Sequence, residues 1–497
     1  MNIAMLLQMA AESAPDRNAL THARHHYTYG QIFQAAQVAA GLFRASGCQY
    51  VSVLDVSSPA VPIALFGAAM AGVAYVPLNY RLTREELDAL IERVTPVYMV
   101  ADDRNHEAYA PRGVGTVIRR AAFLEQTLGG TPDGAEPAED PTAVAVQLFT
   151  SGTTGKPKAA ILRHEHLVSY ILGSVEFMAA DEAEATLVSV PPYHIAGISA
   201  VLSSIYACRR IVQLPDFGAA SWLEHCEHDA VTNAFVVPTM LSRIIDHLDT
   251  IEARPHLPAL KAIAYGGGKM PQHTIERALA MFPQVDFTNA YGLTETSSTI
   301  CLLGPQDHRE AFQSGDPAVR RRLSSVGKPL PSVELEVRDD DGRALGANEA
   351  GEIYVRGPQV SGEYLERRAI RDDGWFPTRD AGFVDEHGYL YLSGRADDVI
   401  IRGAENISPG EIEDVLLTHP LVADACAVGI PSEEWGETVA AAVVLKPDTE
   451  VKISELQHLV RDKLRSSRVP EQVRFVKGLP YNEMGKLLRR EVKTLFA

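Results

Sequence analysis

The chain has 497 residues and a formal net charge of −18, which argues against broad nucleic-acid binding because such proteins usually present a basic face. Its length exceeds one typical domain, so two or more domains are expected. The hydrophobic share of 46% and the charged share of 22% are those of an ordinary globular protein. The five cysteines are odd in number, scattered and without metal-site spacing, which predicts reduced thiols in a cytoplasmic protein: Cys48, Cys208, Cys226, Cys301 and Cys426.

The N-terminal half alternates between helix-like and strand-like segments. Residues 31–43 and 84–94 have a helical pattern, whereas residues 51–56 and 96–100 read as strands. This alternation predicts βα units around largely parallel sheets. Residues 129–141, rich in Gly, Pro and acidic residues, are expected to form a solvated connection.

Residues 57–80 contain no charged side chain and are long enough to cross a membrane. Pro62, Gly67, Gly72 and Pro77 interrupt this stretch, and alanines dilute its hydrophobicity. We therefore expect a buried helix followed by a buried strand at residues 73–76, and no membrane span. The first 14 residues also lack the basic residues that precede the apolar core of a signal peptide.

After residue 142 the strand-like pattern resumes, and it changes character near residue 332. Strands are expected at residues 143–149, 159–163, 186–190, 233–237, 261–265 and 285–289, with helices between them, one of which begins at His164. Residues 333–337 and 351–356 then predict a β-hairpin with an acidic turn, and residues 382–392 predict a second hairpin.

A domain boundary is expected at residues 394–398. Beyond it lie a strand at residues 399–401 and a helix that ends before Pro420. The helix should begin with a capping box of Ser408 and Glu411, with Pro409 in the first helical position. The predicted fold is α/β, with a large N-terminal domain of stacked βα sheets and a β-rich portion (residues 1–394) and a small, mobile α+β C-terminal domain (residues 395–497).

The loop at residues 150–158 has the sequence Thr-Ser-Gly-Thr-Thr-Gly-Lys-Pro-Lys. Its glycines allow close backbone approach, its amides and hydroxyls can donate to phosphate oxygens, and its lysines offset negative charge. It is not a Walker A loop, because only two residues separate Gly152 from Gly155 and Pro157 follows Lys156. The alternative is a solvated hairpin turn, since Ser, Thr, Gly and Pro are ordinary turn residues.

This loop closely resembles the phosphate-binding signature of the adenylate-forming superfamily, which holds acyl-CoA synthetases, adenylation domains of peptide synthetases and firefly luciferase. The resemblance covers nearly the whole chain, with later motifs in the family's order. It implies that ATP or AMP phosphates are bound by the following residues of the loop: Thr150, Ser151, Gly152, Thr153, Thr154 and Lys158.

Two further motifs carry the nucleotide expectations. Residues 291–295, Tyr-Gly-Leu-Thr-Glu, resemble the family's Tyr-Gly-x-Thr-Glu, which implies that Glu295 is a Mg²⁺ ligand, with Thr150 or Ser151 helping on the phosphate side, and that Thr294 faces the phosphate. Taken alone, Glu295 is more simply a solvated surface residue. The triple glycine at residues 266–268 resembles the glycines that form the adenine slot in the family. The alternative is a loose turn without a ligand. The expected nucleotide contacts are Gly267, Gly268, Asn289, Ala290, Tyr291 and Gly292.

Residues 375–380, Trp-Phe-Pro-Thr-Arg-Asp, resemble the family's Trp-x-x-Thr-Gly-Asp, whose aspartate binds the ribose hydroxyls. Asp380 is then the ribose ligand, because a carboxylate accepts from both hydroxyls. Arg379 replaces the usual glycine. If that position requires positive φ, the arginine costs strain; alternatively its cation reaches a phosphate.

The C-terminal part carries three more correspondences. Residues 394–398 resemble the inter-domain hinge, with Arg395 on the ribose and Asp397 as the pivot, against the alternative of a charged turn. Gly403 resembles the glycine that keeps the CoA tunnel open, although Ala404 replaces a second glycine of many relatives. Lys486, in a terminal Pro-x-x-x-x-Gly-Lys, is implied to stabilise negative charge on the reacting carboxylate and α-phosphate.

The motif Pro-Pro-Tyr-His-Ile-Ala-Gly at residues 191–197 resembles that of acyl- and aryl-CoA synthetases, and the aspartate of amino-acid-activating relatives is missing from this region. His194 is expected to act at the acyl pocket; the alternative is a satisfied structural histidine. The expected pocket residues are His194, Gly197, Val237, Tyr265 and Thr299. Relatives for very long chains are often longer than this one, which favours a small, aromatic or compact bulky acid.

The resemblance implies two half-reactions that use ATP, Mg²⁺ and CoA. A carboxylic acid forms an acyl-adenylate with release of pyrophosphate, and the small domain then rotates and admits CoA. Three alternatives stay open. The acyl acceptor could be an acyl carrier protein, or the protein could be a non-catalytic nucleotide-binding regulator. It could also be an enzyme specialised for one half-reaction, an alternative that the unusual Arg379 suggests. Intact Lys486, Glu295 and Asp380 argue against the regulator. A homodimer is also possible.

Overall fold

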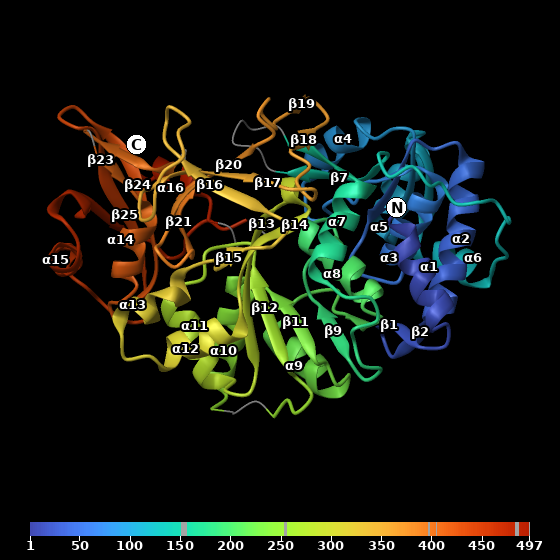
Figure 1. The fold of residues 1–497 in the computed structure, drawn as a ribbon, viewed down its shortest axis with the longest axis horizontal. Coiled ribbons are helices and arrows are strands. Elements are labelled where there is room, and N and C mark those ends of the chain that lie inside the picture. Colours follow the sequence, from blue (N-terminus) through green and yellow to red (C-terminus); the bar gives the residue numbers. More distant parts are fainter. Residues whose placement is uncertain (151–156, 253–255, 396–397, 404, 483–486, 497) are drawn as a thin grey trace.

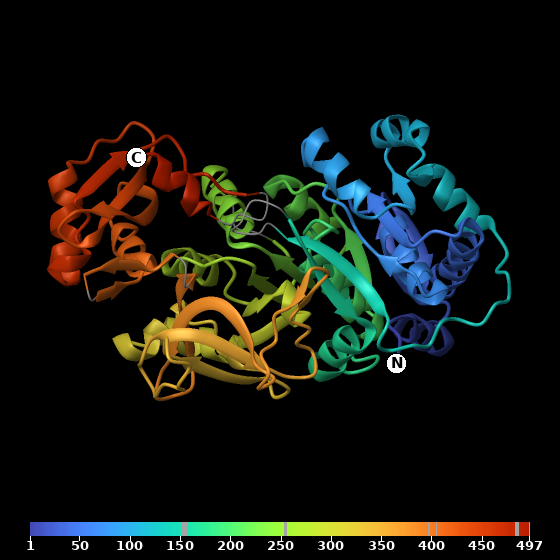
Figure 2. The ribbon, with the colours of Figure 1, turned by 90° about the horizontal axis from the view of Figure 1, so that it is seen from above.

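The computed structural model describes residues 1–150, 157–252, 256–395, 398–403, 405–482 and 487–496. The molecule is elongated, with the N-terminal helices at one end and the C-terminal elements, drawn in red, at the other (Figure 1, Figure 2). Its mixed α/β architecture confirms the predicted fold class, with a large N-terminal part that contains several sheets and a smaller C-terminal part.

Within the described ranges, the strands form four sheets, which we call A to D. In spatial order, sheet A contains β15 (Lys328–Pro329), β14 (Ser298–Leu303), β13 (Asp286–Leu293), β12 (Ala262–Gly266), β11 (Asn233–Val236), β9 (Ala185–Val188), β10 (Arg210–Gln213), β1 (Asn18–His22) and β2 (His25–Thr28). Sheet B contains β19 (Arg367–Arg368), β18 (Glu363–Tyr364), β8 (Lys158–Arg163), β7 (Val144–Thr150), β4 (Ala74–Tyr75), β3 (Tyr50–Leu54), β5 (Val97–Ala101) and β6 (Gly115–Arg119).

Sheets A and B are parallel in their interiors; both edges of sheet A and the β8–β18–β19 edge of sheet B are antiparallel. In sheet A the run from β1 through β10, β9, β11 and β12 to β13 is parallel, and in sheet B β7, β4, β3, β5 and β6 are parallel. Such interiors are buried on both faces, which explains why their strands appeared in the sequence as continuous apolar runs.

Helices cover both faces of these sheets. The core shared by sheets A and B contains α1 (Ala4–Ser13), α2 (Tyr29–Ser46), α3 (Ala60–Ala71), α7 (His164–Ser174) and α8 (Ile195–Tyr206), with α6 (Arg120–Gly129) packed on α2. The far face of sheet A carries α9 (Ala219–His228), α10 (Pro238–Thr250), α11 (Gln272–Met281) and α12 (Pro305–Gln313), followed by α13 (Pro317–Arg320). The far face of sheet B carries α4 (Arg84–Glu92) and α5 (Asp103–Tyr109).

The uncharged stretch at residues 57–80 folds as predicted. It forms α3, which is buried nearly all round, and then β4. Gly72 ends the helix at φ +72°, a conformation that glycine adopts without steric cost. No helix in the described part of the chain combines the length and the apolarity needed to cross a bilayer.

Sheets C and D are antiparallel or mixed. Sheet C contains β16 (Glu334–Arg338), β17 (Gly351–Arg356), β20 (Phe376–Val384) and β21 (Leu390–Arg395), so both predicted hairpins are present. Sheet D contains β23 (Glu405–Ile407), β22 (Ile400–Arg402), β25 (Gly436–Leu445), β24 (Val422–Ser432) and β26 (Gln472–Phe475), and packs with α14 (Pro409–Leu416), α15 (Ile453–Lys463) and α16 (Arg489–Thr494).

The expected capping box at Ser408 is wrong. Helix α14 does begin at Pro409, but the structure shows no side-chain hydrogen bond from Ser408 to the helix N-terminus. The Ser408 hydroxyl donates instead to the carbonyl of Ser393 at 2.6 Å, and Glu411 forms an ion pair with Arg468. Both partners of the box are therefore used in tertiary contacts.

Candidate active site

The predicted nucleotide and acyl residues follow neighbouring strands of sheet A. Strands β9, β11, β12 and β13 are parallel neighbours, so their carboxyl ends lie at one edge of the sheet, where ligands of open α/β sheets bind. The segments after these strands carry His194, Val237, Gly267 and Glu295. The topology thus brings together motifs that lie about a hundred residues apart in the chain.

Gly266, the last residue of β12, lies close against β13. A Cβ on Gly266 would lie 2.2 Å from the Ala290 carbonyl oxygen, so no larger residue fits there, and Gly267 has φ +81°. Gly267 and Gly268 are exposed, which leaves backbone available to a planar ring. Asn289 is buried, and its Nδ2 donates to the Ser325 carbonyl at 3.1 Å, so this side chain is already engaged within the protein.

Two donors hold the proposed ribose carboxylate. The Tyr291 phenol donates to Asp380 Oδ2 at 2.6 Å, and Arg395 Nη1 lies 3.2 Å from Oδ1. Burial, and then the negative charge of Asp380, raise the pKa of Tyr291 well above 10, so the phenol stays a donor. Gly292, next to Tyr291, packs so closely that a Cβ would lie 1.8 Å from the Ser298 carbonyl oxygen. The ribose, adenine and hinge motifs therefore meet at Asp380.

Arg379 adopts the left-handed backbone conformation that a glycine would favour, with φ +62°. Its side chain is 62% exposed, and its Nε lies 3.9 Å from Glu352 Oε1. The backbone of Arg379 therefore has the positive φ that the sequence comparison associated with strain, and its guanidinium lies beside the carboxylate of Glu352 in sheet C.

Glu295 is buried and is held by a tyrosine from a distant part of the chain. The Tyr364 phenol donates to Glu295 Oε1 at 2.5 Å. Burial, followed by the charge of Glu295, raises the pKa of Tyr364, which keeps the phenol protonated. The Lys158 ammonium lies 6.0 Å from the Tyr364 ring centroid, and Thr150 ends the paired strand β7 opposite Lys158. Glu295 and the described end residues of the phosphate loop, Thr150 and Lys158, thus share one neighbourhood, in which Thr294 begins the turn that carries Glu295.

This neighbourhood suits magnesium. No group of three or more metal-binding His, Cys, Asp or Glu side chains occurs among the residues that the structure describes. Mg²⁺ commonly binds through one or two carboxylates together with substrate phosphates and water. A single anchored carboxylate beside a phosphate loop fits that donor set.

His194 is the N-cap residue of α8, and its ring lies against that of Tyr193 in a tilted arrangement, with the ring centroids 4.5 Å apart. Its Nε2 is buried and has no hydrogen-bond partner within the described structure. Burial first, and the charge of Arg81 second, lower the pKa of His194 to about 3. The ring is therefore neutral at physiological pH, with a buried nitrogen available to a bound molecule. This geometry disfavours the reading of a fully satisfied structural histidine.

Of the other expected pocket residues, three have contacts compatible with the prediction and one does not. A Cβ on Gly197 would lie 2.7 Å from the Pro191 carbonyl oxygen, and Val237 packs in the same core as α8. The Thr299 hydroxyl lies 3.5 Å from the Tyr170 hydroxyl. Tyr265 is a correction: it is fully buried in the core on the far face of sheet A, where its hydroxyl lies 2.8 Å from His308 Nε2. Its side chain therefore does not border the pocket.

At the expected CoA tunnel, Gly403 has φ +63°, and an added Cβ would lie 3.4 Å from the Trp435 ring. Six other expected site residues lie outside the described residues: Ser151, Gly152, Thr153, Thr154, Asp397 and Lys486. Their roles stay predictions, as does the exact domain boundary.

Two residues of this site were missed by the sequence reasoning. Tyr364 lies 69 positions from Glu295 and in no motif that we singled out. Lys269 directly follows the triple glycine, yet its Nζ reaches Asp414 of α14 at 2.8 Å. Neither contact has a local sequence signal, because each depends on how separate elements pack.

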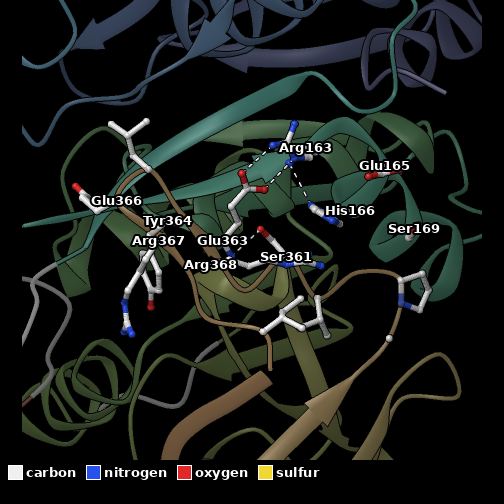
Figure 3. Close-up of a pocket in the computed structure, with 15 residues that line it drawn as sticks. Arg163, Glu165, His166, Ser169, Ser361, Glu363, Tyr364, Glu366, Arg367 and Arg368 are labelled. Atoms are coloured by element: carbon white, nitrogen blue, oxygen red, sulfur yellow. Dashed lines mark hydrogen bonds and ion pairs between the residues drawn. The ribbon is translucent and has the colours of Figure 1, made fainter. Parts of the chain in front are cut away.

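A cavity of about 750 Å³ lies at the edge of sheet B, between the start of α7 and the chain around β18 and β19 (Figure 3). It is lined by Arg163, Glu165, His166, Ser169 and residues of the range 357–370. None of the described site residues predicted from the sequence lines it, but Tyr364 does, so the cavity adjoins the neighbourhood of Glu295.

Comparison with known proteins assigns the chain to a family. The family described as AMP-binding enzyme matches residues 7–365, and the AMP-binding enzyme C-terminal domain matches residues 411–486. The chain belongs to the AMP-binding enzymes. This result confirms the resemblance to the adenylate-forming superfamily, within which the chain is an AMP-forming acyl-CoA synthetase that uses ATP, Mg²⁺ and CoA.

Individual relatives cover nearly the whole chain. The 2-succinylbenzoate–CoA ligase of Bacillus cereus (strain Q1) is 31% identical over 98% of both chains. The o-succinylbenzoate CoA synthetase (MenE) of Bacillus subtilis, solved with the acyl-adenylate OSB-AMP, is 28% identical with a TM-score of 0.84, covering 98% of this chain and 97% of that one. The amide bond synthetase McbA of Marinactinospora thermotolerans is 27% identical with a TM-score of 0.86, over 99% of both chains.

Proposed function

We propose that this acyl-CoA synthetase activates a compact aromatic acid of the 2-succinylbenzoate class. The structural observation that carries the proposal is the buried, unpartnered Nε2 of His194 at the ligand edge of sheet A. In the tautomer that carries the proton on Nε2, its neutral ring can donate one hydrogen bond to a carbonyl or carboxylate oxygen of the acyl group. The 31% identity to a 2-succinylbenzoate–CoA ligase supports the choice of acid.

The roles of the other residues follow from their chemistry. Asp380, fixed by Tyr291 and Arg395, would accept hydrogen bonds from the ribose hydroxyls. Gly267 and Gly268 would lie against the adenine, and Thr150 and Lys158 beside the phosphates. Glu295 would hold Mg²⁺, which offsets phosphate charge when bound.

We propose that Lys486 acts in the first half-reaction, where it stabilises the negative charge that develops on the α-phosphate. Rotation of the small domain about Asp397 then removes Lys486 from the site. In the second half-reaction CoA approaches past Gly403, and its thiol replaces AMP on the acyl group. We assign the present conformation to the first half-reaction, because Lys269, which follows the glycines proposed to line the adenine, binds Asp414 and the Gly410 carbonyl of the small domain.

The test is pyrophosphate release with ATP, Mg²⁺ and 2-succinylbenzoate, beside benzoate, malonate and a medium-chain fatty acid, each with and without CoA. We expect acid-dependent release that is greatest with 2-succinylbenzoate, and acyl-CoA only when CoA is present. Lys486→Ala should abolish release, whereas Lys477→Ala, an exposed lysine nine positions upstream, should retain it. Preference for another acid would overturn the proposed substrate class.

Three further results would redirect the assignment. Pyrophosphate release with transfer to a carrier-protein thiol, and not to CoA, would identify a protein acceptor. Release with amide formation when an amine is supplied would indicate the chemistry named for McbA. Thioester formation from a supplied acyl-adenylate, without any acid-dependent release, would identify an enzyme for the second half-reaction alone.

The setting of the reaction is also a proposal. All five cysteines are free thiols, which supports a reducing, cytoplasmic location. A homodimer is the assembly we propose to test, by sedimentation of the purified protein with and without ATP.

A further inference from the structure

Residues 359–365, which we call the bridging segment, bind strand β8 of sheet B on one side. Glu363 pairs with Ile161, and Tyr364 pairs with Ala160. The Leu365 amide adds a hydrogen bond to the Ala159 carbonyl at 2.9 Å. Strand β8 begins at Lys158, where the phosphate loop ends. The bridging segment is thus bonded to the strand that anchors that loop.

The same segment holds Glu295 by its backbone. The amides of Ser361 and Gly362 donate to the Glu295 carbonyl at 2.9 and 3.1 Å. Gln359, fully buried, donates to the carbonyls of Thr296 and Thr299 at 3.1 and 2.8 Å. The turn that carries Glu295 is therefore tied to sheet B and not only to its own sheet A.

Side-chain alternation in β18 gives its two residues different partners. Glu363 binds Arg163 through both carboxylate oxygens, at 2.7 and 2.9 Å, on the face that borders the cavity of Figure 3. Tyr364 shares its face with Ala160 and Lys158, since paired residues of a sheet point the same way. From there its phenol donates to Glu295 Oε1 at 2.5 Å.

We propose that Tyr364 is a positioning residue for magnesium: its phenol fixes one oxygen of Glu295, so that the other oxygen is presented to the metal beside the phosphate loop. The proposal rests on the proposed role of Glu295 as a Mg²⁺ ligand. Partners that orient a metal-binding side chain are worth about 10- to 100-fold in metal affinity. Because the same segment binds β8, it links Glu295 to the strand that begins at Lys158.

A purely structural role for Tyr364 makes a different prediction. The ring packs between Lys158 and Arg367, whose charged groups lie 6.0 and 5.7 Å from its centroid. Tyr364→Phe keeps the ring and removes only the hydroxyl. Loss of the hydroxyl should therefore affect Glu295 with little change in this packing.

A matched control exists in sheet C. The Tyr354 phenol donates to a carboxylate oxygen of Glu352 at 3.1 Å, and Glu352 lies beside Arg379 of sheet C. Tyr354→Phe removes a tyrosine–glutamate hydrogen bond of the same kind. It should change stability by a similar amount and leave the Mg²⁺ requirement unaltered.

The experiment measures the Mg²⁺ concentration for half-maximal pyrophosphate release and, by calorimetry, the Mg²⁺ dependence of binding of a non-hydrolysable ATP analogue. Wild type, Tyr364→Phe, Tyr354→Phe and Glu295→Gln are compared. We expect Tyr364→Phe to raise the required Mg²⁺ by about tenfold or more, with Tyr354→Phe unchanged. Thioester formation from a supplied acyl-adenylate, which involves no triphosphate, should be retained in Tyr364→Phe.

Two results would overturn the inference. If Glu295→Gln shifts the Mg²⁺ dependence and Tyr364→Phe does not, Tyr364 has no positioning role although the metal site stands. If neither variant shifts it, the assignment of Glu295 fails, and the inference fails with it. An equal loss of both half-reactions in Tyr364→Phe, with a lowered unfolding midpoint, would indicate a structural role only.

Discussion

The backbone of Arg379 gives a prediction about stability at the scale of one residue. The left-handed conformation costs a non-glycine residue roughly 1–2 kcal/mol, part of which is offset by the greater entropy of an unfolded glycine. We expect Arg379→Gly to raise the free energy of unfolding by about 1 kcal/mol, measured by urea titration. Arg379→Ala removes the contact with Glu352 but keeps the Cβ, so it should give no such gain.

Comparison of the half-reactions in these variants tests the functional meaning of Arg379. If the strain impairs acyl-adenylate formation, Arg379→Gly should accelerate pyrophosphate release and leave thioester formation from a supplied adenylate unchanged. Equal stability gains in the glycine and alanine variants would instead place the cost in the side chain and refute the backbone explanation.

His194 gives a prediction about pH. Its pKa is about 3 in the folded protein and about 6.5 when unfolded. Between these values the unfolded chain binds a proton that the folded one does not, so stability is lost as pH falls from 6.5 toward 3. Replacement by glutamine should reduce the slope of unfolding free energy against pH in this window by up to about 1.4 kcal/mol per pH unit. Urea titrations at pH 7, 6 and 5 would show it, and coincident slopes would contradict it.

At the scale of elements, apolar runs predicted the interior strands and the buried helix α3, because a strand or helix covered on all sides leaves a continuous hydrophobic signal. The same continuity hides which way each residue faces, and for that reason the side chain of Tyr265 was assigned to the pocket. The two-residue strand β18 left no periodic signal at all. Its pairing with β8, and with it the link from Tyr364 to Glu295, exists only in the tertiary structure.

Two helical glycines give a matched test of element packing. A Cβ on Gly67 of α3 would lie 2.8 Å from the Ala39 Cβ of α2, whereas one on Gly129 of α6 would meet nothing within 4 Å. Alanine at either site gains about 1 kcal/mol in helix propensity, but overpacking typically costs about 1–3 kcal/mol. We expect Gly129→Ala to stabilise the protein and Gly67→Ala to destabilise it, as measured by thermal unfolding. Stabilisation by Gly67→Ala would mean that α2 and α3 move apart without cost and would contradict this account.

At the scale of the whole molecule, the large and small parts of the chain meet through contacts that the proposed domain rotation would have to break. Lys269, directly after the adenine-slot glycines, binds Asp414 at 2.8 Å and the Gly410 carbonyl at 3.0 Å. Just before the first residue of α14, the Ser408 hydroxyl donates to the Ser393 carbonyl of the large part. These contacts belong to the conformation that we assign to the first half-reaction.

The ion pair between Lys269 and Asp414 should therefore bias the enzyme toward acyl-adenylate formation. Both side chains are about 40% exposed, and such pairs are worth about 0.2–1 kcal/mol, or up to roughly a fivefold shift between conformations. Asp414→Asn should lower the rate of ATP–pyrophosphate exchange relative to thioester formation from a supplied acyl-adenylate. High salt should shrink the difference, because it screens the pair in the wild type. The exchange of charges in Lys269→Asp with Asp414→Lys should restore the ratio. If Asp414→Asn changes both half-reactions equally, the contact does not distinguish the two conformations, and the bias must come from elsewhere in the interface.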